Sequence, residues 1–289
     1  MRFQYLKENQ ERYNIRKACK NLKVSRTGYY AHINKKRTKL EIEDELLSAR
    51  IEHIFYEHKG CYGAKRISES LKREDLHASR RRVGKLMKKK GLYAKRTRYY
   101  YKNYLKKAKN EERPNLLNQI FKAKKKNEIW LGDISYIQTK HVYLYLVAFI
   151  DVYTRRVVGW STATTLKEDL VMQGFLQAYG REKPKEGLIV HTDQGSQFTG
   201  KSFRSMLQKY GSVTSNSRRG NPYDNAMMES FYRKLKTELL QEKAFETTEE
   251  AQQEIFKYIE LYYNKKRMHS ALGYLSPAEY DKAQNVSQN

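Results

Sequence analysis

The sequence of 289 residues has few cysteines, few prolines and no long apolar run. Its two cysteines, Cys19 and Cys61, are far apart and belong to no CxxC or Cys/His pattern, which excludes a disulfide framework and a structural zinc site. The longest uncharged apolar run, residues 142–150, is far shorter than the roughly 18 residues that a membrane-spanning helix needs. Charges occupy the N-terminal region where a secretory signal would have its apolar segment. We therefore expect a cytoplasmic protein without a membrane partner.

Acidic residues are scarce relative to basic ones. The chain has 32 Asp and Glu against 58 Lys and Arg, which gives a formal net charge of +26. Such an excess costs self-repulsion in the folded state, and a polyanion is the partner that would offset it. Hydrophobic residues make up 39% of the chain, so the composition is that of a folded protein with a core and not of a disordered one. Nucleic acid is the expected partner.

The first hundred residues show helical periodicity. The clearest segment is 80–90, where Ser79 is a good N-cap, Gly91 is placed for a left-handed C-cap, and the apolar residues share one face. Shorter segments around 47–55 and 64–71 precede it, and three short helices with tight links are typical of a helix-turn-helix module. The other faces of the last helix are basic, and a merely solvated surface is the alternative to DNA contact. The residues expected to touch DNA here are Arg80, Arg81, Arg82 and Lys85.

We divide the chain into four parts. Residues 1–35 form a weaker helical segment of helix-turn-helix type, and residues 36–94 form the helix-turn-helix DNA-binding domain. Residues 95–126 carry 12 Lys and Arg, only two acids and several tyrosines, which indicates a basic linker. Its rings could stack on unpaired bases, or the segment could be a plain tether. Residues 127–289 form a second domain with a C-terminal helical extension.

The second domain begins with a change from helical to strand-like periodicity. Residues 129–137 are apolar on both faces, which predicts a central strand, and 142–150 and 156–162 follow as strands of an antiparallel meander. The order βββαβαβα predicts an α/β fold with a mixed five-stranded sheet flanked by helices, and a ligand site at the carboxyl ends of the parallel strands. The later elements are expected as a helix at about 167–179, a strand at 188–190, a helix near 202–210, a strand near 213, and helices after 224 and at 249–263.

Three acidic residues stand out in this domain. Asp133 lies within the apolar central strand, Asp193 lies just beyond the end of a later strand, and Glu229 lies on a helix. A buried carboxylate is costly unless it is paired or binds a metal, so three converging acids call for a cation. Glu229, Arg233 and Lys236 share one helix face at i, i+4 and i+7. Spacing alone decides little, because a chain with 32 acids contains many such trios by chance.

The sequence around these acids resembles the orfB-type transposases of the IS3 family of insertion sequences, members of the DDE, or retroviral-integrase-like, superfamily. Between Asp193 and Glu229 lie 35 residues, as the DD35E label of the superfamily requires, and Lys236 matches the basic residue seven places after the glutamate. Ser135, Thr192 and Met268 depart mildly from the family pattern. The matching segments are WLGDIS at 130–135, HTDQGSQF at 191–198, GNPYDNA at 220–226, ESF at 229–231, YN at 263–264, HSAL at 269–272 and LSPAE at 275–279.

The resemblance implies an RNase H-like catalytic core. Asp133, Asp193 and Glu229 would be its catalytic residues and would hold two Mg²⁺ or Mn²⁺ ions. One site would cleave DNA to expose a 3′-OH and then join that 3′-OH to another strand, with no covalent protein–DNA intermediate. The implied partners are double-stranded DNA of the terminal repeats and of the target, further copies of this chain in a synaptic complex, and the smaller upstream protein of the same element. The implied location is the bacterial cytoplasm, on the nucleoid when bound to DNA.

Further DNA contacts are expected near the carboxylates. Lys236 and Arg233 could instead form pairs along the helix surface, and Asn225 could belong to a turn with Asp224. The loop at 217–221 could cover the substrate. The residues expected to touch DNA in this domain are Lys236, Arg233, Arg218, Arg219 and Asn225.

Two other functions fit parts of the sequence. A catalytically silent DNA-binding regulator derived from such an element would use the N-terminal helices alone, but the presence of all three carboxylates argues against it. An RNase H-type nuclease acting on RNA/DNA hybrids would need no module for recognising element ends, and the basic helical region before residue 127 argues against that. We predict a transposase.

Overall fold

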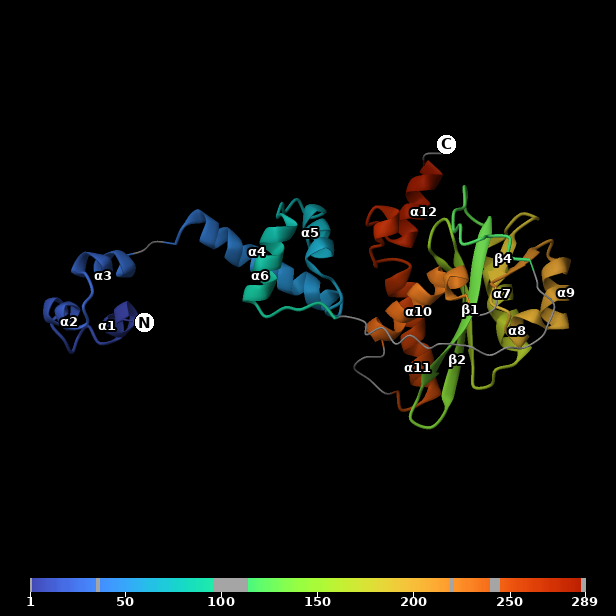
Figure 1. The fold of residues 1–289 in the computed structure, drawn as a ribbon, viewed down its shortest axis with the longest axis horizontal. Helices are drawn as coiled ribbons and strands as arrows, with labels where there is room; N and C mark the ends of the chain where they lie inside the picture. The colour runs from blue at the N-terminus through green and yellow to red at the C-terminus, as the bar shows by residue number, and fades with distance from the viewer. Residues whose placement is uncertain (1, 35–36, 96–113, 219–220, 240–244, 287–289) are drawn as a thin grey trace.

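The N-terminal residues form two groups of helices in the computed structural model, which describes residues 2–34, 37–95, 114–218, 221–239 and 245–286 (Figure 1). Helices α1 (Arg2–Glu8), α2 (Ile15–Asn21) and α3 (Arg26–Ile33) pack around Leu6, Cys19 and Tyr29. Helices α4 (Lys39–Glu57), α5 (Ala64–Lys72) and α6 (Arg80–Lys89) form the second group. The three-helix module predicted from periodicity is therefore confirmed, and α1, α2 and α3 lie within residues 1–35, where the sequence predicted a helical segment.

Local sequence explains where α6 begins and ends. Ser79 Oγ accepts a hydrogen bond from Arg82 N at 3.2 Å, which caps the N-terminus as predicted. Gly91 has a φ of +68°, the left-handed conformation that suits glycine after a helix. The apolar face of α6 is buried against α4 and α5, so packing holds the module together and leaves the basic faces outside.

The second domain is built on a five-stranded sheet of order β3-β2-β1-β4-β5. Its strands are β1 (Ile129–Gln138), β2 (Tyr143–Asp151), β3 (Val157–Ala163), β4 (Ile189–Thr192) and β5 (Val213–Asn216). β1, β2 and β3 pair antiparallel, while β4 runs parallel to β1 and β5 parallel to β4. The predicted mixed sheet with the first strand at its centre is confirmed.

Helices cover both faces of this sheet (Figure 1). One face packs on α7 (Glu168–Glu182), α8 (Ser196–Thr199) and α9 (Lys201–Lys209), and the other on α10 (Ala226–Leu239) and α11 (Thr248–Phe256). Helix α7 approaches closely at Gly159, where a Cβ would lie 2.4 Å from Gly174 O. The short turns η1 (Pro222–Asn225) and η3 (Ser270–Leu272) and the helix α12 (Pro277–Val286) complete the chain. Every described helix is too short or too polar to span a lipid bilayer.

The predicted helix at 249–263 differs from the structure in its second half. After α11 the backbone widens into a π-helix, η2 (Lys257–Tyr263), so successive turns no longer follow a 3.6-residue repeat. Ala251, Ile255, Tyr258 and Ile259 are buried, and Tyr262 is half-buried and packs against the same core. Tyr263, the next residue, is also buried, which a regular α-helical repeat does not predict.

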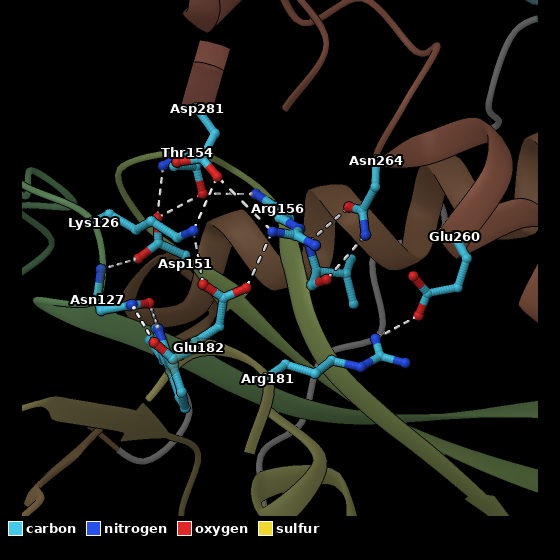
Figure 2. Close-up of polar contacts among 12 residues, drawn as sticks. Lys126, Asn127, Asp151, Thr154, Arg156, Arg181, Glu182, Glu260, Asn264 and Asp281 are labelled. Carbon is cyan, nitrogen blue, oxygen red and sulfur yellow. Dashed lines mark hydrogen bonds and ion pairs between the residues drawn. The ribbon is translucent and has the colours of Figure 1, made fainter. Parts of the chain in front are cut away.

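The end of the predicted linker lies against the second domain. Residue Leu117 is buried in the core beside α10, and Asn216 N at the edge strand β5 donates to Pro114 O at 3.1 Å. Lys126 Nζ reaches Glu182 on α7 at 2.8 Å and Asp281 on α12 at 2.9 Å, as Figure 2 shows. This ion-pair network joins segments that are far apart in sequence. The four-part division of the chain stays a prediction.

The C-terminal segment also contacts the helix-turn-helix module. Met268 is buried in the core of α4–α6, and its backbone N donates to the Tyr62 hydroxyl at 2.8 Å. Arg73 at the end of α5 donates to Tyr274 O at 2.8 Å and pairs with Glu279 at 3.0 Å. The C-terminal extension therefore links the helix-turn-helix module to the sheet domain.

Candidate active site

Asp133, within β1, and Asp193, directly after β4, lie next to each other where the parallel pairing of these two strands ends. The ladder between β1 and β4 ends with Gly132 opposite Thr192, so the next residue on each strand is one of the two aspartates. Residues in register on parallel strands point to the same face of a sheet, and neighbouring strands lie about 4.8 Å apart. The sheet register thus brings together two acids that are separated by much of the domain in sequence.

The local backbone orients both carboxylates. Asp133 Oδ1 accepts a hydrogen bond from Ile134 N at 2.8 Å, and Asp193 Oδ1 accepts one from Gly195 N at 2.9 Å. At Gly195, a Cβ would lie 3.0 Å from Asp193 Oδ1, closer than real side chains approach comfortably. Each aspartate therefore has one oxygen engaged with the backbone, and glycine keeps space beside the second aspartate.

Glu229 is brought to the same edge of the sheet by α10. The helix is fastened to the strands by Tyr232, whose hydroxyl lies 2.6 Å from Asp133 O and 3.0 Å from Leu146 O. Tyr232 follows Glu229 by three residues and so lies on the neighbouring part of the helix surface. Sequence reasoning did not single out Tyr232; its i+3 spacing from the glutamate was the only signal available.

Electrostatics connects the three acids. Burial, together with the charges of Asp193 and Glu229, raises the pKa of Asp133 to about 8, while Lys236 acts to lower it. Burial also raises the pKa of Asp193 and that of Glu229, where Arg233 acts in the opposite sense. Because a like charge raises a pKa only from nearby, the effects of Asp193 and Glu229 on Asp133 place both acids close to it.

This cluster contrasts with the buried acids at the other end of β1. There Glu182 pairs with Lys126 and Arg156, and Asp151 accepts hydrogen bonds from Asn127 N and the Thr154 side chain. By contrast, no described Lys or Arg forms an ion pair with Asp133 or Asp193. Within the described ranges, no three His, Cys, Asp or Glu side chains are arranged as a ready-made metal cage. The carboxylates nevertheless supply the oxygen donors that Mg²⁺ prefers, and their mutual repulsion is of the kind that a cation relieves.

Comparisons with known proteins agree with this geometry. Residues 123–222 and 210–277 each match a model described as an integrase core domain, and residues 41–100 match an HTH-like domain. The transposase for insertion sequence element IS904 of Lactococcus lactis is 54% identical over 250 residues, which span 86% of this chain and 99% of that protein. Transposase InsF for insertion sequence IS3A of Escherichia coli is 31% identical over 97% of this chain and 98% of its own length.

The chain belongs to the IS3-family transposases. It is therefore a polynucleotidyl transferase with an RNase H-like core and a DNA-binding helix-turn-helix module, as the sequence predicted. Among solved structures, a simian T-cell lymphotropic virus intasome in complex with the PP2A regulatory subunit B56 gamma is similar over 80% of this chain and 74% of its own, at 13% identity and a TM-score of 0.48. The HTLV-2 integrase catalytic core domain with magnesium is similar over 54% of this chain and 96% of its own, at 16% identity and a TM-score of 0.38.

Asp224 of the transposase is a buried acid with a structural role. Its carboxylate accepts hydrogen bonds from Arg218 N and from the Arg218 guanidinium, all at 2.8 to 2.9 Å, and from the amides of Asn115 and Gln119. Arg218 holds the pKa of Asp224 well below its usual range. The backbone oxygen of Asp224 lies 2.9 Å from Nε2 of the buried His191. Asp224 thus fixes the start of α10.

The other residues predicted to contact DNA near the site have different surroundings. Lys236 Nζ lies 4.7 Å from the centre of the Tyr136 ring, a cation–π contact. Asn225 is buried and its Nδ2 lies 3.5 Å from Gly132 O, directly before Asp133. Arg233 is exposed on α10, and Arg219 lies outside the described residues. DNA contact by these residues and by Arg218 stays a prediction.

On α6, the basic residues divide into two kinds. Arg80, Arg81 and Lys85 are exposed to solvent. Arg82 instead binds α4, through Asp44 at 2.7 Å and Glu43 at 3.2 Å. Three of the four predicted contacts are therefore presented outward on the transposase, while Arg82 also holds α6 against α4.

Proposed function

We propose that Asp133, Asp193 and Glu229 are the catalytic carboxylates of the transposase and hold two divalent metal ions, Mg²⁺ or Mn²⁺. The observation that carries the proposal is the pairing of β1 with β4, which aligns the two aspartates directly after the last paired residues, Gly132 and Thr192. The raised pKa of Asp133, with contributions from Asp193 and Glu229, supports a shared cation. When bound, such ions supply Lewis-acid stabilisation of the phosphate and activate the attacking oxygen.

The site would carry out 3′-end cleavage and strand transfer. In cleavage, a water oxygen attacks the phosphorus at the end of the element, and the bond to the 3′ oxygen breaks to leave a 3′-OH. In strand transfer, that 3′-OH attacks a phosphodiester of the target, so one phosphodiester forms as another breaks. The residues of the chain orient the acids through Ile134 N and Gly195 N, and Tyr232 holds α10 in place.

DNA is the substrate in both steps, as terminal repeats of the element and as target. We assign recognition of the repeats to the α4–α6 module, with Arg80, Arg81 and Lys85 facing the phosphates and bases. Bringing two ends together needs more than one copy of the chain, so a homo-oligomeric synaptic complex is part of the proposal. The upstream protein of the element is a further expected partner, and the bacterial nucleoid is the expected place of action.

The test is an in vitro joining assay with labelled DNA that carries the element ends, in Mg²⁺. Asp133→Asn, Asp193→Asn and Glu229→Gln should each abolish cleavage and joining while leaving the affinity for the same DNA nearly unchanged. Asp169→Asn, at an exposed acid on α7, is the matched control and should retain activity. Joined product from any of the three site variants would refute the assignment. Absence of joined product from the wild type, with intact DNA binding, would favour the non-catalytic regulator for this fold.

A further inference from the structure

A cavity of about 290 Å³ lies between α10, the C-terminal segment and the helix-turn-helix module. Its volume is close to that of the smaller ligand pockets in proteins. Four cationic side chains line it, and they come from four different segments of the chain. These residues are Arg66, Arg155, Lys234 and Arg267. Opposing charge comes from Glu238, which pairs with Arg267 at 2.7 Å, and from Asp151, which acts on Arg155 from a greater distance. Cations outnumber acids around this cavity.

Several polar atoms around the cavity are buried without a partner. Arg267 is only 2% exposed; its Nε and Nη2 bind Glu238, but Nη1 has no hydrogen-bond acceptor among the described residues. His269 Nε2 and Arg66 Nε are also buried without a partner in this part of the structure. Buried polar groups are nearly always satisfied in folded proteins, so their clustering around one cavity indicates a ligand.

The charges around the cavity repel one another. Burial, together with the charges of Arg267 and Arg66, lowers the pKa of Lys234 to about 8, while Glu238 acts to raise it. Burial likewise lowers the pKa of His269 well below its usual value, with added effects from all four cations. Because each of the four acts on His269, they surround a common point. An anion at that point would remove the repulsion and pair with the free donors.

The turn between β2 and β3 is shaped to present Arg155. Arg155 has a φ of +60°, a left-handed backbone conformation that is uncommon for residues other than glycine and asparagine. Asp151 maintains the turn: its backbone oxygen accepts from Arg155 N at 2.9 Å and its Oδ1 accepts from Thr154 N at 2.7 Å. The guanidinium contacts Met227 on α10. A strained backbone that brings a half-buried cation to a cavity is typical of a binding site.

We propose that this cavity binds a phosphate group through Arg66, Arg155, Lys234 and Arg267. Phosphate has acceptor oxygens for several donors at once, and the arginine fork matches its geometry. The phosphate can come from the DNA backbone or be free inorganic phosphate, which share this chemistry. Ser230 and Lys234 line the cavity on a different face of α10 from Glu229 and Arg233. A ligand here would touch the catalytic helix from its other side.

The first experiment measures thermal unfolding of the full chain in increasing inorganic phosphate, against chloride at equal ionic strength. The double variant Arg155→Gln/Lys234→Gln removes two cavity cations, and Arg204→Gln/Lys209→Gln removes two exposed cations from α9 on the opposite face of the sheet. Wild type and control should show a saturable rise in Tm, and the cavity variant should show none. Without phosphate, the Tm of the cavity variant should be no lower than that of the control, because repulsion between the cavity cations has been reduced. Loss of the phosphate response in the cavity variant could then not be attributed to unfolding.

The second experiment identifies the source with a DNA duplex. If a phosphate of the DNA backbone occupies the cavity, inorganic phosphate should compete with DNA for binding. The slope of log DNA affinity against log salt concentration should then be reduced in the cavity variant by about 1 more than in the control variant. If free phosphate occupies it, the two variants bind DNA equally and the phosphate response persists with DNA bound. An equal rise in Tm with phosphate in wild type and both variants would overturn the proposal. It would also be overturned if phosphate gave no saturable rise in Tm and both variants bound DNA equally. Neither measurement involves DNA cleavage, so failure of the phosphate-site proposal can be distinguished from failure of the carboxylate assignment.

Discussion

The Tyr232 hydroxyl lies 2.6 Å from the backbone oxygen of Asp133, so the helix that carries Glu229 is bonded to the strand that carries the first aspartate. Tyr232 is buried, and its ring packs in the core between α10 and the sheet. Burial and the nearby Asp133 raise the pKa of Tyr232 well above its usual value, so the hydroxyl keeps its proton and remains a donor. The relative position of the acids therefore depends on a residue that carries no charge.

Tyr232→Phe should weaken both the fold and the reaction. The change keeps the ring but removes the hydroxyl that lies within hydrogen-bond distance of Asp133 O and Leu146 O, which should cost about 1–3 kcal/mol of the free energy of unfolding. Denaturant unfolding measures this loss. Strand joining at saturating DNA should fall while DNA affinity is unchanged, because α10 is less firmly held. Equal joining rates for variant and wild type would show that this hydrogen bond does not position the site.

Gly132→Ala should destabilise the sheet beside Asp133. An added Cβ would lie 2.6 Å from Phe149 Cε1 and 3.1 Å from Thr192 Cγ2, so the β1–β4 pairing must shift to admit it. We expect a loss of about 1–3 kcal/mol, read from chemical denaturation. Gly180→Ala is the matched control: nothing lies within 4 Å of its added Cβ, and alanine favours the helix there by about 0.5–1 kcal/mol. Equal stability of the two variants would contradict the close packing.

His58 should make stability depend on pH. Its ring stacks on Tyr62 at 3.7 Å and burial lowers its pKa to about 4, against 6.5 unfolded; Glu57 and Glu238 act to raise the pKa, and Lys266 and Arg267 to lower it. Between pH 6.5 and 4, His58 is therefore protonated in the unfolded chain but not in the folded chain. The stability contributed by neutral His58 is present above pH 6.5 and is lost as the pH falls towards 4, by on the order of 3 kcal/mol at most.

His58→Phe keeps a ring in the stack and removes the titration. The free energy of unfolding, measured with denaturant at pH 7, 6, 5 and 4.5, should fall more steeply with decreasing pH for wild type than for the variant. Other buried histidines, such as His191, titrate in both proteins and cancel in the difference. Parallel curves for the two proteins would mean that His58 takes up its proton without disturbing the fold.

The sequence allowed the sheet and its helices to be predicted, because each element carries its own periodicity. Residues 129–137 are apolar on both faces, and only a central strand buries both. The three carboxylates were found by motif, not by physics: their meeting depends on the β1–β4 register, which pairs residues that are distant in the chain. No local pattern encodes that register.

Other features escaped sequence analysis for the same reason. Asp224 reads as a turn residue, yet its partners Asn115 and Gln119 lie more than a hundred residues before it. The burial of Tyr263 next to the half-buried Tyr262 follows from a π-helix, which a 3.6-residue repeat cannot anticipate. The cavity around Arg267 takes its cations from both ends of the chain and could be recognised only once the chain was folded.

Met268 is part of the hydrophobic core of α4–α6, although these helices end at Lys89. A ribosome releases the chain from its N-terminus onward, so the module that reads DNA emerges long before the methionine that completes it. During synthesis, that core has an open side until nearly the whole polypeptide has been made. Translation that stops early would leave a transposase whose DNA-binding module still lacks a piece of its interior.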